Sequence, residues 1–277
     1  MKKTRFQTTL SCVSFIGKLL LIFLFVFPFL WMLSVSLQTT EETMTFPATI
    51  IPHHFMISNY VDAWTSRPFL LFLRNSVVVV AAILIIQLAV MIPAAYSFAK
   101  YSFKGKSLLF ALVIIAFMTP GQITFLPVYM MMSRWKLLGT LVPQILPFMT
   151  SAFGVFLLRQ YFMQVPTELI EAAKLDGASE IQMLWHVLMP MSKPAISTII
   201  LFNFIAHWND YFWPLVMTNR DAVRPLTLAV KSLYDSEGIT NWNIVMAGNM
   251  FLVFPILLIY AVSNRHIISA FAYTGIK

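Results

Sequence analysis

Apolar residues fill long stretches of this chain, and short segments rich in charge, proline and glycine separate them. Six stretches come close to the roughly 20 residues that a helix needs to cross a bilayer. They cover residues 19–37, 70–98, 108–131, 141–158, 195–217 and 244–263. The pattern predicts an all-α fold, a polytopic membrane protein with six transmembrane helices in a single domain over residues 1–277.

Helix-breaking residues are clustered in the third and fourth of these stretches. Residues 119–121 (Thr-Pro-Gly) stand before Gln122 in the third, and two prolines interrupt the fourth. Breaks of this kind are tolerated where the freed backbone groups face protein or a wet cavity. We therefore expect polar side chains near these breaks to border a path through the protein.

Composition and charge exclude a soluble protein. The chain is 59% hydrophobic and 11% charged, whereas soluble domains carry about 25% charged residues. Its net charge of +8 does not indicate nucleic-acid binding. If both termini are cytoplasmic, most Lys and Arg residues fall on the inner side, as the positive-inside rule requires. The first apolar stretch has no small-residue cleavage site, so we expect it to be retained as a helix.

A charged loop, residues 159–194, interrupts this pattern between the fourth and fifth stretches. Pro166 suits the first turn of a helix, where its missing N–H is not needed. Glu168 and Glu171 would lie near the positive end of that helix dipole. Gly177 is placed to end the helix in a left-handed conformation. Ser179 has a glutamine three residues later, the spacing of a capping box that begins a second helix.

Three motifs in this loop occur in a fixed order: residues 171–173 (Glu-Ala-Ala), residues 176–178 (Asp-Gly-Ala), and Pro190 thirteen positions past the glycine. Together they resemble the EAA loop of permease subunits in ATP-binding-cassette (ABC) importers that work with a solute-binding protein. Leu184 and Met189 depart from the residues usual in that loop, but both remain apolar.

The resemblance implies that the first short helix docks on a cytoplasmic ATPase and transmits its closure to the channel. It assigns ATPase coupling to Glu168, Glu171, Ala172, Ala173, Asp176, Gly177, Ala178 and Pro190. It also implies the partners: a second, related permease, two cytoplasmic ATP-binding subunits and an extracytoplasmic solute-binding protein.

The resemblance extends over residues 70–265. It includes residues 73–76 (Leu-Arg-Asn-Ser), 94–96 (Ala-Ala-Tyr), 103–105 (Phe-Lys-Gly), 118–120 (Met-Thr-Pro), 156–160 (Phe-Leu-Leu-Arg-Gln) and 208–210 (Trp-Asn-Asp). This combination is similar to carbohydrate-uptake permeases of the type found in the maltose and glycerol-3-phosphate transporters. It implies a multi-pass protein of the cytoplasmic (inner) membrane.

Polar residues within the stretches are candidates for the solute path. A charge near the bilayer centre costs about 2.5–3.5 kcal/mol on insertion scales, so Asp210 is expected to face protein or water. Sugars offer hydroxyls and apolar C–H faces, which suit the mixture of polar and aromatic residues around Asp210. The alternatives are an aromatic belt at the outer interface and polar contacts that only join helices. The candidates are Thr119, Gln122, Asn203, Trp208, Asn209, Asp210, Tyr211 and Asn249.

The chain lacks the GxxxxGK[ST] loop that binds ATP phosphates, and it lacks HExxH and GxSxG. We therefore predict a non-catalytic subunit without a metal or cofactor of its own, whose partner subunits bind ATP and Mg²⁺. The predicted function is ATP-driven translocation of a mono- or oligosaccharide by alternating access. A glycerol-3-phosphate permease and a secondary carrier are the alternatives. A phosphate would require a cation in the path, and no span interior offers an obvious one.

Overall fold

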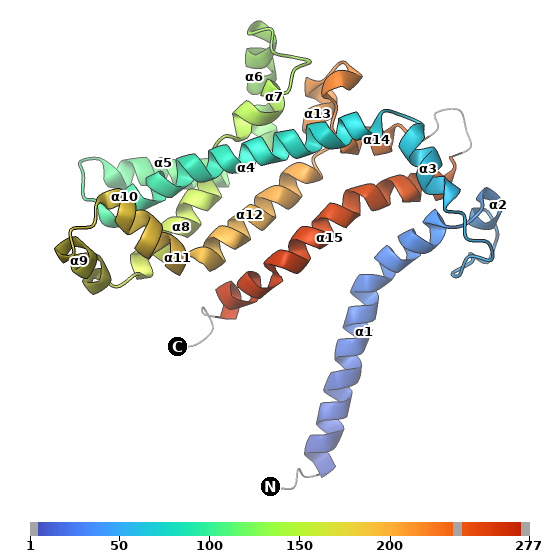
Figure 1. The fold of residues 1–277 in the computed structure, drawn as a ribbon, viewed down its shortest axis with the longest axis horizontal. Coiled ribbons are helices and arrows are strands. Elements are labelled where there is room, and N and C mark those ends of the chain that lie inside the picture. Colours follow the sequence, from blue (N-terminus) through green and yellow to red (C-terminus); the bar gives the residue numbers. More distant parts are fainter. Residues whose placement is uncertain (1–4, 235–239, 273–277) are drawn as a thin grey trace. The chain divides into compact units, whose positions relative to one another are not determined.

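The computed structural model describes residues 5–234 and 240–272, and every element assigned within them is helical. The chain divides into two compact units, Met1–Phe69 with Val230–Val253 and Leu70–Ala229 with Phe254–Lys277. The single domain over residues 1–277 stays a prediction, and each unit is described by itself (Figure 1).

Length and composition mark the helices that can cross a membrane. In the described part of the chain four segments meet this test: Ser14–Ser36, Phe69–Lys100, Val142–Gln164 and Trp242–Val262. Two bent pairs raise the number to as many as six: Lys106–Met118 with Gly121–Arg134, bent by 96°, and Glu180–Met191 with Lys193–Trp208, bent by 78°. The all-α fold class is confirmed.

The first unit contains α1 (Arg5–Ser36), α2 (Thr40–Thr43), α3 (Ser58–Thr65) and the start of α15 (Trp242–Ala272). Asn59 joins three of these segments. Its amide donates to the carbonyls of Ser36 (3.0 Å) and Gln38 (2.8 Å), and its carbonyl accepts from the Asn243 amide (3.0 Å). Because Asn59 is buried, these bonds satisfy groups that would otherwise be costly to desolvate.

The second unit contains the remaining helices. They are α4 (Phe69–Lys100), α5 (Lys106–Met118), α6 (Gly121–Arg134), α7 (Val142–Ile145), η1 (Leu146–Phe148), α8 (Ala152–Gln164), α9 (Thr167–Leu175), α10 (Glu180–Met183), η2 (Leu184–Leu188), α11 (Met189–Met191), α12 (Lys193–Trp208), α13 (Phe212–Met217), η3 (Asp221–Val223) and α14 (Leu226–Lys231), which extends past the boundary into the first unit.

The third and the fifth predicted spans are each divided into two helices in the structure. The third is divided at residues 119–120, where the chain bends by 96° between α5 and α6, so the predicted break is confirmed. The fifth, predicted as one helix over residues 195–217, is instead divided into α12 and α13. Nothing in residues 209–211 breaks a helix as proline does, which explains why the sequence pattern missed this break.

Candidate functional site

The first helix of the charged loop, α9, begins at Thr167, and Pro166 precedes it with an extended backbone (ψ 137°). The prediction that Pro166 lies in the first turn is therefore wrong by one position. Glu168 does lie in the first turn, where the helix dipole favours a negative charge. Glu168 and Glu171 are exposed while Ile170 is buried, so α9 presents an acidic face and anchors the opposite one.

Gly177 ends α9 in the predicted left-handed conformation, with φ of 77°. The amide of Ala178 donates to the carbonyl of Ala173 (3.0 Å), and the amide of Gly177 donates to that of Lys174 (3.0 Å). These two bonds define a Schellman motif, which satisfies the last carbonyls of a helix. The sharp turn is thus fixed by backbone geometry that glycine adopts without strain.

The second helix of the loop starts at the predicted capping box. The Ser179 hydroxyl accepts from the amide of Gln182 (3.3 Å), and the amide of Ser179 donates to the Gln182 side chain (2.8 Å). The helix then continues through η2 and α11, where Leu184 and Leu188 are buried while Pro190 is exposed. Leu184, one of the departures from the family pattern, thus fills an apolar position.

The predicted coupling residues divide into exposed and packed ones. Exposed members are Glu168, Glu171, Ala172, Asp176, Gly177 and Pro190. Ala173 and Ala178 pack against a hydrophobic core. That core contains Ile170 from α9 together with residues of α4, α8, η2 and α12, including Tyr96 and Ile199. The loop is therefore joined to three long helices rather than suspended between two.

Polar contacts join the same loop to the end of α4. The Tyr96 hydroxyl donates to the Glu180 carboxylate, and the Lys100 ammonium donates to the carbonyl of Val165 (3.1 Å). A hydrogen bond to Glu180 also raises the pKa of Tyr101, just beyond the helix end, so this hydroxyl stays protonated and able to donate. Figure 1 shows α9 and α10 at this end of α4.

The break between α12 and α13 contains three of the predicted path residues. Asn209 and Tyr211 are exposed, and Asp210 lies between the helices rather than within one. Its carboxylate accepts from the amide of Trp213 (3.2 Å), and its backbone carbonyl accepts from the Thr227 hydroxyl (2.9 Å). These two contacts hold Asp210 in place at the start of α13.

Asp210 lines a cavity of about 570 Å³ within the second unit. Ligand pockets of proteins have volumes of about 300–1,000 Å³. Gln122 and Thr124 of α6 also line the cavity, together with the aromatic residues Phe125, Phe148 and Trp213. The structure therefore brings together Gln122 and Asp210, two of the predicted path residues that lie far apart in the sequence.

The other candidates make contacts of a different kind. Thr119, Asn203 and Asn249 each donate to the carbonyl four residues earlier, at 2.7, 3.0 and 2.9 Å. Trp208 is 4% exposed and stacks on Phe204, with ring centroids 5.3 Å apart. These contacts lie within single helices, and Asn249 belongs to the first unit. A role of these four residues in a solute path stays a prediction.

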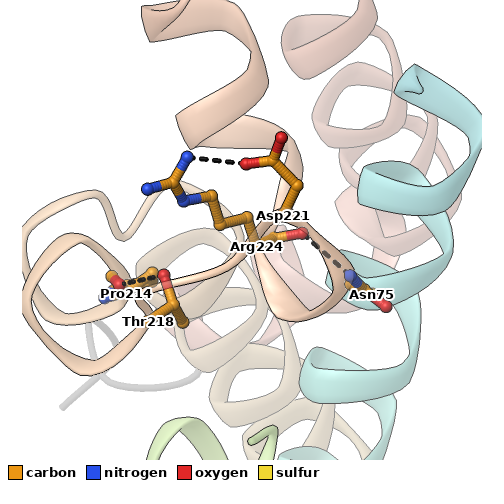
Figure 2. Close-up of polar contacts among 5 residues, drawn as sticks. All are labelled: Asn75, Pro214, Thr218, Asp221 and Arg224. Atoms are coloured by element: carbon orange, nitrogen blue, oxygen red, sulfur yellow. Dashed lines mark hydrogen bonds and ion pairs between the residues drawn. The ribbon is translucent and has the colours of Figure 1, made fainter. Parts of the chain in front are cut away.

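Figure 2 shows the contacts that hold the segment after α13. The Thr218 hydroxyl donates to the carbonyl of Pro214 (2.7 Å), and Arg224 forms an ion pair with Asp221 (2.7 Å). The Asn75 amide of α4 donates to the carbonyl of Ala222 (3.0 Å) and to that of Arg224 (3.0 Å), the second of which Figure 2 draws. The segment 218–226 is thus fixed to α4 by a side chain almost 150 residues earlier.

Asn75 and Ser76 belong to a motif of the resemblance, but sequence reasoning did not predict their contacts with this segment. The Ser76 hydroxyl accepts from the amide of Leu226 (2.8 Å), beside the Asn75 contacts. The Gln144 amide donates to the carbonyl of Val223 (2.9 Å) in the same segment. The sequence signal for these contacts was a polar Asn-Ser pair at the start of a long apolar stretch.

The fold and site define a polytopic helical membrane subunit with a charged helical loop and a partly polar cavity. Residues 91–273 match the family described as the binding-protein-dependent transport system inner membrane component. The chain belongs to this family. It is a permease subunit of an ABC transporter of the inner membrane, and it is non-catalytic.

Relatives and solved structures agree with this assignment. The chain is 28% identical to the arabinooligosaccharides transport system permease protein AraQ of Halalkalibacterium halodurans over 278 residues, 99% of each chain. It is 32% identical to the sn-glycerol-3-phosphate transport system permease protein UgpE of Pectobacterium atrosepticum over 232 residues, 81% of this chain and 83% of that protein.

Two solved structures share the fold. A chain of a bacterial ABC transporter involved in the import of the acidic polysaccharide alginate superposes with a TM-score of 0.83 at 22% identity, over 96% of this chain and 99% of that one. A chain of the alginate transporter in complex with a pentasaccharide-bound periplasmic protein gives a TM-score of 0.63 at 14% identity, over 95% of this chain and 96% of that one.

Proposed function

We propose that this permease translocates a mono- or oligosaccharide by alternating access, with a second related permease, two cytoplasmic ATPase subunits and an external solute-binding protein. The observation that carries the proposal is the cavity beside Asp210. Its lining combines a carboxylate, an amide and a hydroxyl with several aromatic rings. Such a lining suits a solute that presents both hydroxyl groups and apolar C–H faces.

The exposed face of the loop supports docking on the ATPase. Leu175, Ile181 and Trp185 are 89%, 70% and 55% exposed, and they lie in the same loop as the exposed carboxylates of Glu168 and Glu171. Apolar side chains among charges on a surface mark protein interaction sites. We therefore assign the ATPase contact to this face and propose that the loop and both termini lie on the cytoplasmic side.

The orientation can be measured separately from transport. In a Cys12→Ser background, single cysteines at Ser58 and at Ser179 are exposed to a membrane-impermeant thiol reagent added to intact cells. Both positions are exposed in the structure. We expect Ser58→Cys to react and Ser179→Cys to react only after the membrane is permeabilised. The opposite pattern would contradict the proposed topology.

Glycerol 3-phosphate is the second candidate substrate, and the identity of 32% to a glycerol-3-phosphate permease favours it. Uptake by cells that express the complete transporter distinguishes the two. Labelled arabinotriose, maltotriose and glycerol 3-phosphate are supplied separately, with an ATPase-inactive transporter as control. ATP-dependent uptake of a saccharide supports the proposal, and uptake of glycerol 3-phosphate alone contradicts it.

A further inference from the structure

We infer that Asp210 acts as a charge filter in the solute path, so that this permease accepts neutral saccharides and rejects anionic ones such as sugar phosphates and uronates. The inference rests on the proposed function and narrows its substrate class. It starts from the charges that line the cavity described above.

Asp210 is the only ionisable side chain in the described lining of that cavity. The remaining polar groups there are the Gln122 amide and the Thr124 hydroxyl. Lysine, arginine and histidine are absent from this lining, and in the described part of the chain no such side chain forms an ion pair with Asp210. The lining that this chain supplies therefore holds one carboxylate and no cationic side chain.

The position of that charge is fixed. The contacts to the Trp213 amide and the Thr227 hydroxyl hold Asp210 on both its side chain and its backbone. Asp210 also lines a small neighbouring cavity of about 10 Å³ with His207. Because the carboxylate cannot swing away to pair with a distant cation, a solute that enters the larger cavity meets it.

A fixed carboxylate discriminates by charge. Clefts that carry one sign of charge between low-dielectric walls raise the local concentration of the opposite ion by about 10- to 1,000-fold. The same field repels a phosphate or a carboxylate. Neutral sugars are not repelled, and their hydroxyl groups can donate to the carboxylate, while Phe125 and Trp213 offer rings for their C–H faces.

This inference predicts that the solute of this chain differs in charge from the solutes named for two of its relatives. One of the similar permeases belongs to a glycerol-3-phosphate system, and one of the similar structures belongs to an importer of an acidic polysaccharide. A relative of an arabinooligosaccharide system handles neutral sugars. The cavity chemistry places this chain with the last group.

The filter can be measured without knowing the sugar. The assembled transporter, in nanodiscs and with Cys12→Ser, receives a single Thr124→Cys in the cavity or a Ser58→Cys control in the first unit. Each is treated with a cationic and an anionic methanethiosulfonate reagent. We expect the cationic-to-anionic rate ratio to be about tenfold higher at Thr124→Cys than at Ser58→Cys.

Further substitutions test whether the rate ratio at Thr124→Cys depends on the charge of Asp210. Asp210→Asn should lower the ratio to that of Ser58→Cys, while Asp210→Glu and His207→Gln should preserve it. An unchanged ratio in Asp210→Asn would overturn the inference, and so would a cavity cysteine that neither reagent reaches. If Asp210→Asn fails to assemble, the comparison of the two cysteines in the otherwise native transporter still decides.

Uptake then separates this inference from the proposed function. Transport of glycerol 3-phosphate or of a galacturonate oligomer by the native transporter would overturn the filter, whatever the reagent ratio. Absence of transport for every saccharide would contradict the proposed function, while a tenfold reagent ratio would still support the filter. Uptake of neutral saccharides alone supports both.

Discussion

The proposed coupling loop (residues 159–194) and the cavity lie in the same unit, but they are built in opposite ways. The loop takes its shape from neighbours in sequence: the turn at Gly177 and the cap at Ser179 are closed by bonds that span three to five residues. The cavity is assembled from α6, η1 and the α12–α13 break, which are separated by many residues. Local signals therefore suffice to predict the loop, whereas the cavity requires the fold.

The largest effect is expected where the loop depends on one backbone conformation. Gly177→Val forces a β-branched residue to a φ of 77°, which glycine adopts freely and valine does not. Since nothing lies within 4 Å of the added Cβ, the damage should be confined to the turn. We expect transport to fall by more than tenfold, measured as uptake per inserted permease.

Gly105 provides the matched control, because it has a φ of 82° and equally open surroundings. It caps α5 outside the coupling loop. If Gly105→Val reduced transport and ATPase stimulation as strongly as Gly177→Val, the loss would reflect general strain rather than coupling.

The next largest effect tests the cavity. Asp210→Ala removes a charged acceptor, and a hydrogen bond to such a group contributes about 1.5–3 kcal/mol. We expect uptake per assembled transporter to fall by roughly 10- to 100-fold while the ATPase subunits remain bound. An unchanged ratio of uptake to assembled complex would show that Asp210 only caps α13.

A smaller effect is expected from the hydrogen bond that joins the loop to α4. Tyr96→Phe removes the donor to Glu180 but keeps the buried ring in the core. We expect the amount of solute carried per ATP hydrolysed to decrease several-fold, which corresponds to one lost hydrogen bond of about 1 kcal/mol. Glu180→Gln should retain part of the function. A stability loss without a change in this ratio would indicate a structural role only.

The smallest effects belong to the segment shown in Figure 2. Asp221→Asn breaks an ion pair whose side chains are 39% and 50% exposed, and such pairs contribute about 0–1 kcal/mol. Asn75→Ala instead leaves two carbonyls without their donor. Thermal unfolding of the purified transporter should show a clear decrease for Asn75→Ala and almost none for Asp221→Asn. Equal decreases would contradict this ranking.

The sequence predicted those features that depend on adjacent residues. The Gly177 turn, the Ser179 cap and the break at residues 119–120 were all recognised from short motifs. The contact between Tyr96 and Glu180 joins residues 84 positions apart, so no local pattern contains it. The end of α12 before Asp210 was missed because its neighbours, tryptophan and asparagine, carry no strong helix-breaking signal.

Helix α4 connects the segment after α13 with the loop, because it makes contact with both. Asn75 holds the segment after α13, and Tyr96 holds the loop, about 30 Å apart along the helix axis at 1.5 Å per residue. If α4 can adopt two alternative placements, a ligand or partner at either end of the helix can shift the equilibrium between them. Thermodynamic linkage then makes the influence reciprocal. If an occupant near Asn75 raises the affinity of the loop for a partner by some factor, that partner raises the affinity for the occupant by the same factor.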